Sequence, residues 1–380
     1  MKYSSIRYLY LSVPLLYCLL ALAASNILPF KSAIPISVAL YSISDVLLSS
    51  AIVFIILRFY IKKELLIFHF RQLICFKLEK YWYIILFMAL VSAYYAKSTL
   101  WIISSGMTRE DLTINGGVSF VMLFFSPFFK VITPFCLYFG SSLRLRFCLL
   151  LGLFCSLLYG ASMAELLYFG FIILTLYSLF SIKNIWSLVL PFLLLIFFSF
   201  LIARYAQTVR YGENIDLYSF SLLVLEKILK YRAFSFYLSD ILINSNVFSY
   251  KLLYPFFGYP YEWIISKFYP DIIYFDSNFI VSYHYLGGDN NNPYLANVIY
   301  PWWSFYFYSF GPFGLILKAL WCFLILRMLL MFRFFFTAIY SIALLLYIGQ
   351  FSFPLISINA LATIFLLIAV DLAVRLRGIK

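Results

Sequence analysis

The polar stretch 282–293 holds the two side chains best suited to move a proton. His284 and Asp289 lie five residues apart there, among glycines, asparagines and tyrosines. An imidazole or a carboxylate can accept the proton of an attacking hydroxyl when it lies within hydrogen-bond reach. The alternative is a histidine that only holds its own loop together. The other histidine, His69, lies in a basic stretch predicted to face the cytoplasm.

Three arginines lie at the end of the apolar run 184–203 or in the polar segment after it: Arg204, Arg210 and Arg232. A guanidinium is a planar fork that matches phosphate oxygens and keeps its charge at membrane depth. These arginines are therefore predicted to bind phosphate or pyrophosphate. The alternative is a surface salt bridge with one of the nearby acids, Glu213, Asp216 or Glu226.

A few ionisable residues interrupt the apolar runs, where an unpaired charge costs several kcal/mol. Asp45 and Lys130 are predicted to form a structural pair, while Lys97 and Lys318 are predicted to reach the membrane surface with their long side chains. Glu165 lies at a predicted outer turn. It is a third candidate proton acceptor, or simply a solvated carboxylate.

Several familiar chemistries have no motif in this chain. The sequence contains no GxxxxGK[ST] phosphate loop, no HExxH zinc pair and no GxSxG nucleophile elbow. The six cysteines form no CxxC pair, and carboxylates are too sparse to predict a metal site. We therefore expect no metal and no cofactor, and any energy must come from the substrate or from a gradient.

The amino-acid composition indicates the class of protein that positions these residues. Of 380 residues, 65% are apolar and 11% are charged, with a formal net charge of +13. That balance excludes a soluble or disordered chain. The Lys and Arg cluster between the apolar runs, so they are interpreted as topology signals and not as a nucleic-acid surface.

The apolar runs predict an all-α, polytopic membrane protein with about ten transmembrane helices. They cover residues 8–30, 33–57, 81–103, 118–138, 147–181, 184–203, 303–327 and 334–370. Two of these runs are long enough to be hairpins, turning near 160–165 and near 349–354. Basic residues flank alternate ends, which predicts that both termini are cytoplasmic. The resulting regions are helices 1–7 in 1–203, one large periplasmic loop in 204–302, and helices 8–10 in 303–380.

The predicted loop is dense in Tyr, Asn and Asp and contains two short amphipathic runs, 236–242 and 261–268, that would lie at the membrane interface or dip into a cavity. Aromatic rings beside Asn and Asp are typical of a sugar-binding cleft. The alternative is an interfacial aromatic belt, which we favour for Trp302 and Trp303. A smaller polar segment around Arg109 is predicted on the same side.

This layout resembles the Wzy-type O-antigen polymerases and, more distantly, the O-antigen ligases. The ligases carry a His-Asn-x-Tyr-Leu stretch followed by a Gly-x-x-Gly-Leu helix start. Here Asn292, Tyr294 and Leu295 match the first motif, and Gly311 and Gly314 match the second. Asn291 occupies the histidine position, which leaves His284 or Asp289 as substitute bases.

The resemblance implies a glycosyltransferase C-like fold in the bacterial inner membrane and glycosyl transfer at its periplasmic face. The donor would be an undecaprenyl-pyrophosphate-linked oligosaccharide and the acceptor a second lipid-linked repeat unit, with a chain-length regulator protein as a partner. Asn292, Tyr294 and Arg109 would then contact sugar. Two alternatives stay open: a transporter or flippase of lipid-linked sugars, and a polytopic acyltransferase that modifies a surface glycan.

Overall fold

The structure is a computed structural model. It describes residues 9–60, 78–105, 120–139, 141–160, 164–179, 186–211, 216–244, 252–269, 284–289, 292–296, 300–355 and 358–376. Arg109 lies outside these residues. The side chains of Glu165, Arg210, Asp289 and Asn292 also lie outside what is described, although their backbones are placed.

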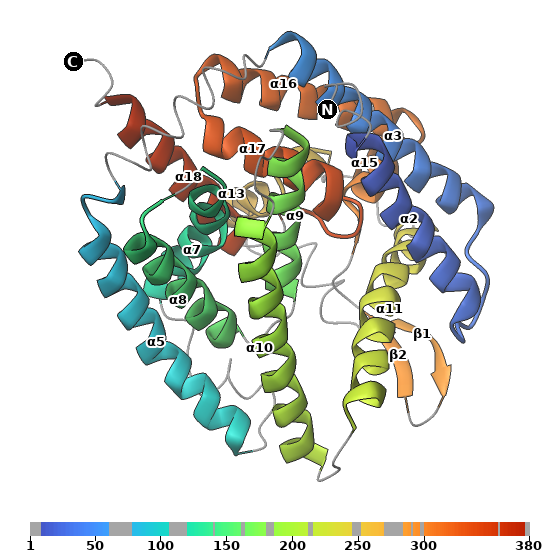
Figure 1. Cartoon of the computed structure of the whole chain (residues 1–380). Coiled ribbons are helices and arrows are strands. Elements are labelled where there is room, and N and C mark those ends of the chain that lie inside the picture. The colour runs from blue at the N-terminus through green and yellow to red at the C-terminus, as the bar shows by residue number, and fades with distance from the viewer. Residues whose placement is uncertain are drawn as a thin grey trace. The chain divides into compact units, whose positions relative to one another are not determined.

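The described part of the chain is mainly helical (Figure 1). Its helices are α2 (Leu9–Ile27), α3 (Ile36–Phe59), α5 (Trp82–Ser104), α7 (Phe120–Phe139), α8 (Leu143–Gly160), α9 (Ala164–Leu179), α10 (Trp186–Tyr211), α11 (Leu217–Asn244), α12 (Tyr254–Phe257), α13 (Tyr259–Phe268), α15 (Trp302–Phe310), α16 (Phe313–Met331), α17 (Phe335–Ala343), the π-helix η2 (Leu344–Ile348) and α18 (Ile358–Leu376). Two strands, β1 (His284–Asp289) and β2 (Asn292–Ala296), complete the list.

Every predicted apolar run coincides with one or more of these helices. Run 147–181 contains the end of α8 and the start of α9 on either side of its predicted turn, and run 334–370 turns between η2 and α18 as predicted. Within the described residues, four helices are long and apolar enough to cross a membrane: α3, α7, α16 and the Trp82–Trp101 part of α5. The count of ten crossings stays a prediction.

The chain divides into two compact units built from interleaved segments. Unit 1 comprises Met1–Tyr60, Ser221–Phe332 and Ser341–Leu361. Unit 2 comprises Ile61–Phe220, Arg333–Tyr340 and Ala362–Lys380. A Phe220/Ser221 boundary inside α11 and a Tyr340/Ser341 boundary inside α17 mean that single helices contribute residues to both.

In unit 1, α2 and α16 both pack against α3, and α15 packs against α16. Their shared core contains small and medium side chains and two large aromatic ones: Cys18, Ala21, Val38, Val46, Leu315, Phe236 and Trp303. Trp303 is completely buried there. Helix α11 also packs against this core through Phe236.

The predicted helix 303–327 is broken into α15 and α16 at Gly311. Gly311 has a φ of +60°, and its N–H caps the Phe307 carbonyl 2.7 Å away, which closes α15. A left-handed residue at this position favours glycine, and the following Pro312 cannot continue the α15 ladder. Gly314 then packs against the backbone of Tyr306, so a side chain there would collide with α15.

Unit 2 is assembled from α5, α7, α8, α9 and α10, with α18 and the first residues of α17. The α5 and α8 helices pack along each other, and Gly152 of α8 lies directly against the Phe129 ring of α7. Asp371 of α18 accepts hydrogen bonds from the Phe336 N–H at 3.1 Å and the Thr337 N–H at 3.0 Å. Its carboxylate therefore caps the start of α17.

The segment predicted as a long loop, 204–302, contains more helix than expected. Arg204, its first residue, lies inside α10, and the run 236–242 lies inside the 28-residue α11 instead of forming a short separate helix. The run 261–268 does fall in a short helix, α13. The helical reach of α10 and α11 follows from the absence of Gly and Pro between Trp186 and Tyr211 after Pro191, and between Leu217 and Asn244.

Candidate functional site

Helix α11 presents two different faces within unit 1. Glu226, Lys230, Phe234 and Tyr237 recur at helical spacing and meet the β1–β2 hairpin or the Pro29–Lys31 loop. Arg232 and its neighbours one turn on belong to the other side and meet α2 and the turn after η2. Figure 1 shows the hairpin lying alongside α11. The helix thus separates an arginine site from a hairpin site.

Arg232 is enclosed by neutral acceptors and aromatic rings. Its side chain is buried, at 2% exposure. Nη1 donates to the Gln350 carbonyl at 2.7 Å and to Ser235 Oγ at 2.9 Å, and Nη2 donates to Gln350 Oε1 at 2.8 Å. The rings of Tyr17, Phe351 and Phe236 surround the guanidinium, with centroids 5.1, 5.1 and 5.4 Å from Cζ. These are cation–π distances.

No carboxylate in the described part of the chain forms an ion pair with Arg232. The alternative predicted for it, a surface salt bridge, is therefore wrong, because the guanidinium is buried and its partners are neutral. Its Nε–H is also buried and has no hydrogen-bond partner among the described atoms. Nη1 uses both of its N–H groups and Nη2 uses one, while Nε donates to no described atom.

The buried acid of α3 is neutralised by a different cation. Lys318 Nζ of α16 lies 2.6 and 2.7 Å from the two carboxylate oxygens of Asp45, and both side chains are buried. The predicted pair of Asp45 with Lys130 is wrong, as is the prediction that Lys318 extends to the membrane surface. The helix pair α3 and α16 brings together residues 273 positions apart, which sequence spacing cannot reveal.

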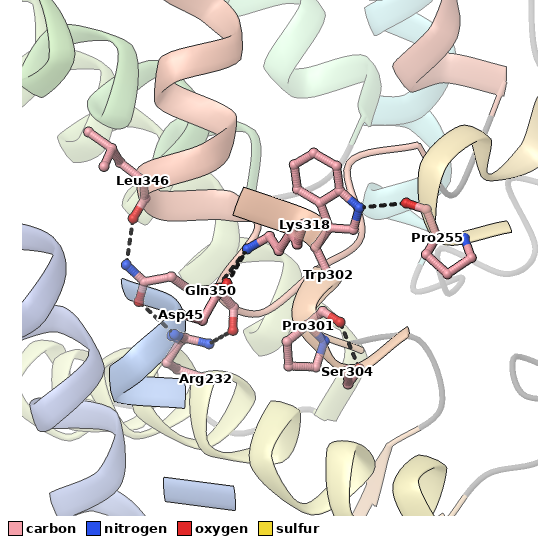
Figure 2. A network of polar contacts seen from close by, with 9 residues as sticks. All are labelled: Asp45, Arg232, Pro255, Pro301, Trp302, Ser304, Lys318, Leu346 and Gln350. Atoms are coloured by element: carbon pink, nitrogen blue, oxygen red, sulfur yellow. Dashed lines mark hydrogen bonds and ion pairs between the residues drawn. The ribbon is translucent and has the colours of Figure 1, made fainter. Parts of the chain in front are cut away.

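Gln350 connects the arginine to η2 and to α2, and Figure 2 shows its bonds to Arg232 and Leu346. Its Nε2 donates to the Leu346 carbonyl of η2 and to the Pro14 carbonyl of α2. The adjacent Gly349 carbonyl accepts from the Trp302 N–H at 2.9 Å, and Trp302 Nε1 donates to the Pro255 carbonyl at 3.0 Å. Trp302 and Trp303 are thus buried inside unit 1, so the interfacial belt predicted for them is wrong.

His284 begins β1 and is half-buried in the hairpin. Its Nε2 is buried and has no hydrogen-bond partner among the described atoms. Burial lowers the pKa of this imidazole below its usual value, so the ring is neutral and able to accept a proton at neutral pH. Asp289 is the last residue of β1 and pairs in register with Asn292 of β2.

Backbone hydrogen bonds attach the hairpin to the Pro29–Lys31 loop. Lys31 donates its N–H to the Leu286 carbonyl and Gly288 donates to the Pro29 carbonyl, each at 2.8 Å. A Cβ on Gly287 would lie 2.5 Å from Lys31 N, and its φ is +136°. Sequence analysis noted these glycines only as part of a polar stretch. In the structure, Gly287 and Gly288 allow the α2–α3 connection to lie against β1.

Tyr294 is enclosed by side chains of unit 1. It is 3% exposed, Lys230 Nζ lies 4.0 Å from its ring centroid, and its hydroxyl donates to Glu226 Oε1 at 3.3 Å. Phe30 meets it edge-on. The open aromatic face predicted for sugar stacking is therefore not present at Tyr294, because a cation and two phenylalanines already pack around the ring.

The other predicted site residues are distributed over both units. Arg204 and Arg210 lie on α10, and Glu165 lies on α9, all in unit 2. Arg232, His284, Asp289, Asn292 and Tyr294 belong to unit 1. Arg204 is half-buried. Among the described residues, no group of three or more His, Cys, Asp or Glu side chains is arranged to hold a metal ion.

Comparison of this chain with protein-family models, with curated proteins and with solved structures finds no match. The sequence analysis missed Gln350, although a signal was present: it is the sole polar amide in the apolar stretch 334–357, and it lies in the predicted turn.

Proposed function

We propose that this chain polymerises lipid-linked oligosaccharide repeat units of a bacterial surface polysaccharide. The growing chain is transferred from undecaprenyl pyrophosphate to a second lipid-linked unit at the periplasmic face of the inner membrane. Apolar helices long enough to span a bilayer support membrane embedding. The enzymatic activity and the periplasmic location are proposals that rest on residue chemistry and on the family resemblance.

The observation that carries the proposal is the buried charge of Arg232, which forms no ion pair with a described carboxylate. Three hydrogen bonds to neutral acceptors and three aromatic rings hold the guanidinium. The nearby carboxylate of Asp45 interacts with it electrostatically but is in contact with Lys318, so the three groups together keep one net positive charge. A cation buried in a weakly polar interior attracts an anion far more strongly than the same cation in water. A departing pyrophosphate is an anion of the kind that such a charge stabilises, and fixed charge is often a large catalytic contribution.

The reaction balances with groups of this chain. The oxygen of an acceptor sugar hydroxyl forms a bond to the anomeric carbon of the donor while the bond from that carbon to pyrophosphate breaks. The pyrophosphate departs with the electron pair. The hydroxyl proton passes to a base, and the candidate in this chain is the unpartnered Nε2 of His284, although its hairpin packs on the face of α11 opposite Arg232. Cleavage of the bond between the donor sugar and pyrophosphate supplies the energy for the new glycosidic bond. The reaction therefore requires no nucleotide and no metal ion from the protein.

The decisive genetic test is deletion of this chain in the strain that encodes it, followed by analysis of lipid-linked glycans and surface polysaccharide. Loss of a polymerase leaves a single repeat unit on the lipid anchor and on the surface. Loss of a flippase leaves no unit displayed at the periplasmic face. Loss of an acyltransferase leaves full-length chains without acyl groups. Either of the last two results overturns the proposal.

A further inference from the structure

The partner of Arg232 is an amide, which is an unusual choice for a buried cation. A carboxylate at position 350 would accept the same hydrogen bonds and would also neutralise the guanidinium. Gln350 instead accepts from Arg232 twice, through its backbone carbonyl at 2.7 Å and through Oε1 at 2.8 Å. Both bonds orient the fork without cancelling its charge.

The amide is itself held on its other side. Gln350 Nε2 donates to the Leu346 and Pro14 carbonyls, so its Oε1 must point toward Arg232. Leu346 belongs to the π-helix η2, in which the ordinary i to i+4 ladder is displaced. The carbonyls around Gln350 accept hydrogen bonds and would repel a carboxylate oxygen. The surroundings therefore select an amide, which both donates and accepts.

The hydrogen bonds to Gln350 and Ser235 determine which N–H groups of the guanidinium stay unpaired. Three of the four Nη N–H groups are committed to Gln350 and Ser235, and the buried Nε–H donates to no described atom. The Gly349 carbonyl, bonded to the Trp302 N–H, fixes the turn that carries Gln350. Figure 2 shows Gln350 bonded to Arg232 on one side and to the Leu346 carbonyl on the other.

We propose that Gln350 is a positioning residue that holds Arg232 in one orientation while keeping its positive charge available to a phosphate-bearing substrate. This inference rests on the proposed function for the identity of the anion, and it deepens it by assigning the residue that sets the charge and direction of the cation. Gln350 acts through Arg232 and does not itself contact substrate.

The test compares Gln350→Glu and Gln350→Leu with wild type in purified, detergent-solubilised protein, using inorganic pyrophosphate as the probe. Pyrophosphate raises the thermal unfolding midpoint of the wild type. Gln350→Glu supplies a counter-ion to Arg232 but places a carboxylate oxygen against the Leu346 and Pro14 carbonyls, so its two effects on the midpoint without ligand oppose each other. Per amount of folded protein, it binds pyrophosphate about tenfold or more weakly. Gln350→Leu releases the fork, and therefore lowers both the midpoint and the affinity. Gln72→Glu, in the predicted cytoplasmic stretch, is the matched control for adding one carboxylate and behaves as wild type.

Measuring both stability and pyrophosphate affinity in Gln350→Glu distinguishes a residue that positions Arg232 for an anion from one that only stabilises the fold. A purely structural glutamine predicts that Gln350→Glu, at equal folded amount, leaves pyrophosphate binding and polymer length unchanged; that result overturns the inference. Absence of any pyrophosphate effect on the wild type overturns it as well. Weakened binding in Gln350→Glu supports the inference even where the deletion strain makes full-length polymer, in which case the proposed polymerase function fails and the anion site stands.

Discussion

At the scale of single residues, the pair Asp45–Lys318 shows how a buried charge depends on one partner. Lys318→Met leaves the Asp45 carboxylate buried and unpaired, and Asp45→Leu does the same to Lys318. Removing one partner of such a pair costs about 3–5 kcal/mol, whereas replacing both with apolar residues is often close to neutral. We expect each single variant to lose most of its folded abundance and the double variant to recover it, measured by thermal unfolding in detergent. Equal stability of all three would contradict the pairing.

His284 gives the hairpin a dependence on pH. Its pKa is lowered by burial, so the docked hairpin favours the neutral imidazole. The undocked hairpin binds more protons below a pH of about 6.5, the ordinary imidazole value. Docking is therefore fully stable above that pH and weakens as the pH falls through the lowered pKa. Hydrogen exchange of the strand amides between acidic and neutral pH measures this, and His284→Gln is expected to remove the difference.

Residue types were easier to predict than their surroundings. That Arg232 carries a special charge followed from the chemistry of guanidinium, and that His284 can accept a proton followed from imidazole. The burial of Tyr294, Trp302 and Trp303 did not, because aromatic residues have the same sequence pattern in a core, a belt or a sugar cleft. The partner of Asp45 was inaccessible for a similar reason, since any buried lysine satisfies the rule that a charge needs a counter-ion.

At the scale of elements, helix positions followed closely from hydropathy, because a long apolar run must satisfy its backbone internally. The bounds of α3 and α7 lie within a few residues of the predicted runs. The break at Gly311 and the hairpin were not predicted. The break depends on Gly311 and the hairpin on Gly287 and Gly288, all at positive φ. Their effect is set by tertiary contacts that hydropathy does not contain.

The hairpin's attachment can be tested at Gly287. Gly287→Ala places a Cβ 2.5 Å from Lys31 N and 2.7 Å from Phe30 Cα, so β1 must leave the Pro29–Lys31 connection. Gly311→Ala is the matched control, because its φ is also positive but nothing lies within 4 Å of the added Cβ. We expect faster hydrogen exchange at Lys31 and Gly288 in Gly287→Ala only. Equal protection of these two amides in both variants would show that the close approach at Gly287 does not hold the hairpin in place.

Asp371 makes a corresponding prediction for unit 2. Asp371→Ala leaves two N–H groups of α17 and the Thr337 hydroxyl without their acceptor. Each unsatisfied buried donor costs about 1–3 kcal/mol. Asp371→Asn retains one acceptor oxygen and is expected to lose less. The thermal unfolding midpoint should fall in the order wild type, Asn, Ala, and an Ala midpoint equal to wild type would rule out a capping role.

At the scale of the whole molecule, orientation follows from the placement of basic residues. Accessibility tags at Lys77, Lys183 and Arg333 are expected to report the cytoplasm, and a tag at Asn290 the periplasm, because Lys and Arg flank the inner ends of apolar runs. A cytoplasmic result at Asn290 would remove the hairpin from the compartment where the lipid-linked acceptor is displayed. The location of Asn290 therefore tests the predicted orientation and the proposed catalytic role of the hairpin together.

The most direct measurement of the central claim is turnover by the purified protein in lipid nanodiscs. The substrate is an undecaprenyl-pyrophosphate-linked repeat unit, and the products are a two-repeat lipid and free undecaprenyl pyrophosphate. We predict that the wild type forms both products in equal amounts and that Arg232→Lys, which replaces a fork with a point charge, is about a hundredfold slower at equal folded abundance. Formation of neither product by the wild type, or equal rates for Arg232→Lys, would contradict the account.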